Sequence, residues 1–230
     1  MTTLSKFFDK VFEKIPGYIF GILSFLIGII GPGLALLLSP EYMMWRYSIS
    51  QLAHETGGLF LNIGLISSNI LTIPFIIYLG RVLKDDQINE SIRKFAIGAG
   101  ILATISSILV WTFSGELSAT YSFISDLHGF FALISWFSGA LVCALISFLM
   151  RKNIKFNKKI TIFGYIVSGI IIFYLIPFII TNLCYVLRDL CFSFGTFLTH
   201  YINASLEWLV LFSLSTWNLA NSIYLKRKNL

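Results

Sequence analysis

This 230-residue chain contains seventeen Lys and Arg residues, and their distribution along the sequence constrains the fold more than any other feature. Fifteen of them fall in four short places that are separated by long apolar stretches. These places are the N-terminus (Lys6, Lys10, Lys14), two connectors (Arg81, Lys84, Arg93, Lys94 and Arg151, Lys152, Lys155, Lys158, Lys159) and the C-terminus (Lys226, Arg227, Lys228). Because Lys and Arg collect at the cytoplasmic flanks of membrane spans, the pattern predicts a multi-pass protein of the cell membrane with both termini cytoplasmic.

The composition excludes an ordinary soluble domain. Hydrophobic residues make up 57% of the chain and charged residues only 12%, against about 25% charged in a soluble domain. The net charge of +6 does not indicate a nucleic-acid partner, because the basic residues flank apolar stretches and form no patch on a soluble fold. We expect membrane lipids as the partners, since anionic lipid of the inner leaflet attracts such residues.

The apolar stretches predict an all-α integral membrane protein built as a six-transmembrane-helix bundle. A span needs about 20 residues. The six spans are expected near 18–38, 57–79, 95–113, 127–150, 160–181 and 204–225, within one membrane domain over residues 17–226. Residues 1–16 place apolar and charged residues at helical spacing, which predicts an interfacial amphipathic helix. Gly31-Pro32-Gly33 predicts a kink or an end of the first span near its outer end.

The segment 182–203 is the hardest to assign. A seventh span here would put Arg188 and Asp189 at the middle of the bilayer and move the basic C-terminus outside. We therefore predict an outer amphipathic segment. It serves as a lid, as a loop or as a contact for a protein partner or a second copy, and the sequence does not choose among these.

All three histidines, His54, His128 and His200, fall at predicted outer ends of spans. Ionisable groups near membrane depth are costly to bury and are therefore candidates for a functional site. We predict His54, His128 and Glu207 as catalytic or metal-ligating residues. The predicted lipid- or ligand-binding residues are Ser50, Asn62, Asp126, Ser135, Arg46 and Arg188. Small and amide residues follow His54, His128 and Glu207 at helical spacing, which indicates faces turned toward other helices.

Two interpretations of these residues stay open. Two imidazoles and a carboxylate can hold a zinc-like ion that activates water, or Glu207 can act as a general base without a metal. In the alternative, the same side chains cap helices or bridge spans by hydrogen bonds, with Asp126 capping the fourth span. No H-x-x-x-H or H-E-x-x-H spacing is present, and no cofactor can be named.

Short motifs in the first half of the chain resemble a known membrane family. They are Pro40-Glu41-Tyr42, Ser48-Ile49-Ser50-Gln51-Leu52, Phe60-Leu61-Asn62-Ile63-Gly64-Leu65 and Asp126-Leu127-His128. They resemble the family catalogued as domain of unknown function 998, which is similar in turn to the Frag/DRAM/Sfk-type six-span proteins. The resemblance covers Leu206-Glu207 only weakly, since Ser205 and Trp208 depart from the family's pattern. It implies a six-span fold and makes lipids the expected ligand.

Three functions follow as hypotheses. The first is a protein that binds or organises membrane lipid through an outward-facing polar cavity. The second is an integral membrane enzyme, a hydrolase or a lipid-remodelling enzyme, that uses His54, His128 and Glu207 on a lipid headgroup. The third is a small-solute transporter, which is least favoured because no predicted span carries a charge near its midpoint and no repeat symmetry is visible. The first two hypotheses require the outer ends of spans two, four and six to meet.

Overall fold

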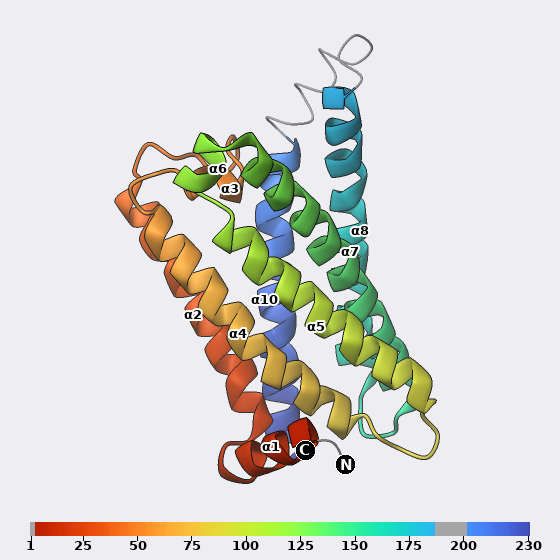
Figure 1. Cartoon of the computed structure of the whole chain (residues 1–230). Coiled ribbons are helices and arrows are strands. Elements are labelled where there is room, and N and C mark those ends of the chain that lie inside the picture. Colours follow the sequence, from red (N-terminus) through yellow and green to blue (C-terminus); the bar gives the residue numbers. More distant parts are fainter. Residues whose placement is uncertain (1–2, 187–201) are drawn as a thin grey trace.

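The computed structural model describes residues 3–186 and 202–230, and these residues form helices and connectors without any strand. The helices are α1 (Thr3–Lys14), α2 (Gly17–Leu38), α3 (Ile49–Leu52), α4 (Gly58–Val82), α5 (Glu90–Thr112), α6 (Glu116–Thr120), α7 (Ser122–Lys152), α8 (Lys158–Val186) and α10 (Ala204–Arg227). The long helices pack side by side into one bundle (Figure 1). The predicted all-α membrane class is therefore confirmed.

Five helices, α2, α4, α5, α7 and α8, are long and apolar enough to cross a membrane. The sixth predicted span corresponds to α10, which has 24 residues but carries Glu207 and two asparagines, Asn218 and Asn221, along its length. These polar groups lower its hydropathy, and α10 is not among the five candidates. It nevertheless packs between α2 and α8 inside the bundle (Figure 1).

Two of the differences from the expected helix boundaries concern residues singled out in the sequence. The fourth predicted span starts at Ser122, five residues before the expected start, so Asp126 lies inside α7 and does not cap it; the N-cap residue is Tyr121. The fifth predicted span corresponds to α8, which extends through Val186 into the segment predicted as an outer amphipathic element. The rest of that prediction, 187–201, lies outside the described residues, as do Arg188 and His200.

Helices α2 and α4 approach each other closely where Gly31 of α2 faces Gly64 of α4. A Cβ atom added to Gly64 would lie 2.6 Å from the Cα atom of Gly31, so only glycine fits both positions at this separation. On the same interface, Ser24 Oγ lies 2.7 Å from Thr72 Oγ1, and Ser68 Oγ donates a 2.7 Å hydrogen bond to the Ser24 carbonyl. Of the two outcomes predicted for Gly31-Pro32-Gly33, a kink or an end of the helix, the end is wrong, because α2 continues through Pro32 to Leu38.

Both termini lie at one end of the bundle, together with the two basic connectors (Figure 1). Tyr78 in the last turns of α4 donates a hydrogen bond to the Leu230 carbonyl. Helix α1 is fixed at this end by an ion pair of 2.7 Å between Arg81 and Asp9. We call this the basic end, and the opposite end, with α3 and α6, the acidic end. The core between them is apolar and includes Phe75, Leu79, Ile146 and Trp217.

The buried Arg93 joins α4 to α5 at the basic end. Its guanidinium makes two hydrogen bonds to the Glu90 carboxylate, at 2.7 and 2.6 Å. A third bond, of 2.7 Å, runs to the Gly80 carbonyl near the end of α4. The planar fork of arginine satisfies both groups at once, which a lysine cannot do.

Candidate functional site

Three of the predicted site residues meet at the acidic end of the bundle in one hydrogen-bonded chain. Ser50 lies in its middle: its Oγ atom is 3.4 Å from Glu207 Oε1 and 3.3 Å from His128 Nε2. The residues come from α3, α10 and α7. We call this arrangement the polar chain. It brings together the outer ends of predicted spans four and six, whereas the third member comes from α3, just before predicted span two, and His54 is not part of it.

Short-range interactions position Ser50. Ser48 begins α3 with a capping box, in which its hydroxyl accepts from the Gln51 backbone N–H and Gln51 accepts from the Ser48 backbone N–H. Glu207 Oε2 accepts a 3.1 Å bond from the Ile49 N–H. The carboxylate thereby binds the first turn of α3, where unpaired N–H groups favour an anion.

Tyr42 fixes the connector that precedes α3. Its hydroxyl donates to the carbonyls of Tyr47 and Ser48, at 2.7 and 2.6 Å, and accepts a 3.2 Å bond from Trp208 Nε1. Burial raises the pKa of Tyr42 above its ordinary value of 10.0, so the phenol stays protonated over the physiological range. The connector is thus bound to α10 beside Glu207.

The orientation of His128 determines which atom it offers to Ser50. His128 Nδ1 lies 3.0 Å from the Val110 carbonyl, near the end of α5. A carbonyl oxygen only accepts hydrogen bonds, so Nδ1 carries a proton. In the neutral imidazole the lone pair therefore resides on Nε2, 3.3 Å from Ser50 Oγ. The Ser50 hydroxyl donates its one proton to Glu207 Oε1 in the structure, so it must rotate toward Nε2 before His128 can act as its base.

The remaining predicted residues lie apart from the polar chain. Asn62 accepts a 2.9 Å hydrogen bond from the Ser114 hydroxyl, which joins α4 to the connector after α5. His54 and Asp126 are exposed. Arg46 is also exposed, and its guanidinium lies 5.5 Å from the centre of the Tyr47 ring.

The metal hypothesis receives no geometric support. Among the side chains that the structure describes, no three His, Cys, Asp or Glu groups lie close enough together to hold a metal ion. His128 and Glu207 both contact Ser50 instead, and His54 lies exposed on the connector.

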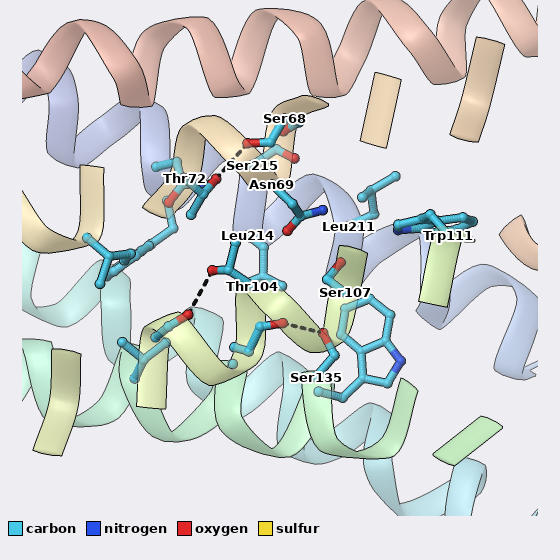
Figure 2. A pocket seen from close by; sticks show the side chains of 18 residues that line it. Ser68, Asn69, Thr72, Thr104, Ser107, Trp111, Ser135, Leu211, Leu214 and Ser215 are labelled. Atoms are coloured by element: carbon cyan, nitrogen blue, oxygen red, sulfur yellow. Dashed lines mark hydrogen bonds between the residues drawn. The ribbon is translucent and has the colours of Figure 1, made fainter. Parts of the chain in front are cut away.

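A cavity of about 100 Å³ lies deeper in the bundle, between α4, α5, α7 and α10. Figure 2 shows Asn69, Thr104 and Ser135 around this space, each on a different helix. Its polar lining consists of hydroxyl and amide groups from Ser68, Asn69, Thr72, Thr104, Ser107, Ser135, Ser215 and Asn218, without any charged side chain. Of the predicted site residues, Ser135 lines it, donating a 3.1 Å bond to the Ala103 carbonyl.

The polar chain lies close above this cavity. Trp111 and Leu211 both line the cavity. Trp111 directly follows Val110, whose carbonyl accepts the hydrogen bond from His128. Leu211 lies one helical turn after Glu207. With a rise of 1.5 Å per residue, Leu211 lies about 6 Å along α10 from Glu207. The two features therefore form one polar region at the acidic end and in the middle of the bundle.

Sequence reasoning missed the contribution of α5 to this region. Thr104, Ser107 and Trp111 recur at the spacing of one helix face, i, i+3 and i+7, and all three line the cavity. That spacing was readable in the sequence. The hydrogen bond from His128 to the Val110 carbonyl could not be predicted from the sequence, because a backbone acceptor leaves no signal in a pattern of side chains.

Comparisons with family models, with curated proteins and with solved structures find no match to this chain. Its function must therefore be argued from the site itself.

Proposed function

We propose that this multi-pass membrane protein has six spans, with the basic end at the cytoplasmic face. Two contacts of α10 support its assignment as the sixth span. Near its start Glu207 bonds Ile49 at the acidic end, and near its finish the Tyr224 hydroxyl donates to the Lys155 carbonyl at the basic end. Helix α10 thus extends over the same height as the five apolar helices. Two of its polar groups, Glu207 and Asn218, form hydrogen bonds to other elements, which compensate for their burial.

We further propose that the protein binds a neutral, hydroxyl-bearing membrane lipid, whose headgroup enters the uncharged cavity. The single observation that carries this proposal is the ring of eight hydroxyl and amide side chains around one cavity at membrane depth. Polar groups in lipid are costly unless they are paired. Six of the eight side chains already donate hydrogen bonds within the protein. Their oxygen atoms keep lone pairs that can accept from the hydroxyl groups of a ligand.

The size and charge of the cavity define the ligand class. One water molecule needs roughly 10–15 Å³ of such space, so a cavity of about 100 Å³ accommodates several waters or a small polyol. A cation would need carboxylate or carbonyl ligands to replace its hydration shell, and no acidic side chain lines the cavity. A neutral headgroup fits better than an ion, which also weighs against ion transport.

Native mass spectrometry of the full-length protein from mild detergent tests this proposal, with identification of retained lipids. The variant is Thr104→Val, which keeps the shape of the side chain but removes a hydroxyl from the cavity. The matched control is Thr112→Val on the same helix, because Thr104 and Thr112 both donate to the carbonyl four residues earlier, and Thr112 is exposed.

We expect the wild type and Thr112→Val to retain neutral lipid, and Thr104→Val to retain about 2- to 10-fold less, the range for one hydrogen bond. Equal retention in all three proteins, or retention of no neutral lipid by the wild type, would contradict the proposal.

The polar chain supports a second candidate function, hydrolysis of a lipid ester. In this reaction Ser50 Oγ attacks the ester carbonyl while its proton passes to His128 Nε2, and His128 then protonates the leaving alcohol. Water, deprotonated by His128, next cleaves the acyl-serine and releases the fatty acid. Here Glu207 is a positioning residue, because it binds the Ile49 N–H next to the nucleophile.

A fluorophosphonate probe, which labels activated serines, distinguishes this candidate from lipid binding alone. We expect labelling of the wild type and of Ser48→Ala, no labelling of Ser50→Ala, and weak labelling of His128→Gln. Labelling that persists in Ser50→Ala, or its absence from the wild type, would exclude the hydrolase. We also propose, from the short motifs alone, that the chain is related to the family of unknown function 998, for which a lipid is the expected ligand.

A further inference from the structure

A second hollow, of about 510 Å³, lies at the basic end beside the first two turns of α8. It is lined by Arg151, Phe156, Lys158, Thr161, Ile162 and Tyr165. We call it the basic groove. It shares no lining residue with the uncharged cavity, so a ligand in the basic groove is independent of the function proposed for that cavity.

The two cations of the basic groove have no anionic partner within the described residues. Four other basic side chains at this end form ion pairs: Arg81 with Asp9, Arg93 and Lys94 with Glu90, and Lys155 with Asp85. Arg151 and Lys158 form no ion pair in the described part of the chain. Two unpaired cations beside one hollow, at the positive N-terminus of a long helix, attract an anion.

The depth of the lining residues matches an amphiphile. Arg151 is the second-last residue of α7 and Lys158 the first of α8, so both lie at the rim of the bundle. Ile162 and Tyr165 lie about 6 and 10 Å farther along α8, toward the apolar middle of the bundle. Lys158, Thr161, Ile162 and Tyr165 follow the spacing of one helix face.

The inner part of the basic groove offers apolar surface and one spare hydroxyl. Ile162 is 44% exposed and Tyr165 is 37% exposed, although both lie inside the length of α8. Thr161 already donates to the Asn157 carbonyl, whereas the Tyr165 hydroxyl has no partner in the described residues. An acyl chain beside Ile162 would cover this surface, and a free phosphate would leave it uncovered.

We propose that the basic groove binds one anionic phospholipid of the leaflet at the basic end. Its phosphate lies between Arg151 and Lys158, and an acyl chain follows Ile162. Basic pockets between spans on the cytoplasmic side suit such headgroups, and the arginine fork suits phosphate oxygens.

Native mass spectrometry of the full-length protein, titrated with dioleoyl-phosphatidylglycerol or dioleoyl-phosphatidylcholine, tests this proposal. The variant is Arg151→Gln with Lys158→Gln. The control is Lys84→Gln with Lys226→Gln, which removes the same charge from exposed basic residues at the same end, outside the groove. All four substitutions are at exposed sites and leave the core intact.

We expect the wild type and the control to bind the phosphatidylglycerol in preference to the phosphatidylcholine. The groove variant should lose about 25-fold in affinity for the anionic lipid, or fivefold per cation, which corresponds to about 1 kcal/mol each. An equal loss in the control, or no preference for the anionic lipid in the wild type, would overturn the proposal. Full displacement of the lipid by inorganic phosphate would assign the groove to free phosphate and would also overturn it.

Discussion

Replacing Gly64 by alanine tests whether the glycine contact between α2 and α4 limits the stability of the bundle. The new Cβ atom would lie 2.6 Å from Gly31 Cα, whereas ordinary contacts begin at 3.4 Å. The helices must therefore separate by the difference, about 0.8 Å. A rigid separation of this size would lengthen the 2.7 Å bond between Ser24 and Thr72 to about 3.5 Å, beyond normal hydrogen-bonding distance.

Overpacking of this kind costs about 1–3 kcal/mol, and one weakened hydrogen bond adds about 1 kcal/mol. Against this, replacing glycine by alanine inside a helix gains up to about 1 kcal/mol. The cost exceeds the gain, so we expect Gly64→Ala to lose about 1–3 kcal/mol of unfolding free energy. Denaturant or thermal unfolding of the purified protein in detergent measures this loss.

The matched control is Gly98→Ala in α5, where an added Cβ meets no atom within 4 Å. We expect this variant to be as stable as the wild type or slightly more stable. If Gly64→Ala were as stable as Gly98→Ala, the reasoning about the α2–α4 contact would be refuted.

Three further predictions concern other contacts. Glu207→Ala leaves the buried Ile49 N–H without an acceptor and should cost about 1–3 kcal/mol, whereas Glu207→Gln keeps an acceptor; equal unfolding midpoints for the two variants would contradict this role. Because burial raises the pKa of Tyr42, the folded state retains a proton that the unfolded state loses above about pH 10, so stability should fall as the pH rises beyond 10. Unfolding of Tyr42→Phe should show a smaller fall over the same range, and an identical profile would refute the assignment. Arg93→Lys loses the fork that joins Glu90 and Gly80 and should lower the unfolding free energy by about 1–3 kcal/mol; an unchanged midpoint would show that the fork contributes nothing.

The fold class could be predicted because the decisive signals are local. Apolar stretches of about 20 residues define helices in a bilayer, and the described part of the chain has five such helices. Boundaries were less predictable. Tyr121 begins α7 without any side-chain cap, so nothing in the sequence distinguished Ser122 from the expected start at 127. The first span was expected over 18–38 and α2 agrees with it, with Pro32 inside the helix.

The candidate site was predictable in its members and unpredictable in its arrangement. His128, Glu207 and Ser50 were each singled out as polar residues near membrane depth. That Ser50 lies between the other two depends on the path of the connector before α3, which Tyr42 fixes through contacts to Tyr47, Ser48 and Trp208. The contact with Trp208 joins segments more than 150 residues apart, and no periodicity within one helix encodes it.

The low hydropathy of α10 has a consequence for how the protein is made. In the six-span arrangement that we propose, α10 leaves the ribosome after the other five spans, and its polar groups weaken its own partition into lipid. Asn218 bonds Thr72 of α4, and Glu207 bonds Ile49 before α4, so both partners are synthesised long before α10. The earlier helices can therefore form the surface against which α10 packs before α10 is made. Membrane insertion of α10 is then coupled to the tertiary folding of the helices that precede it.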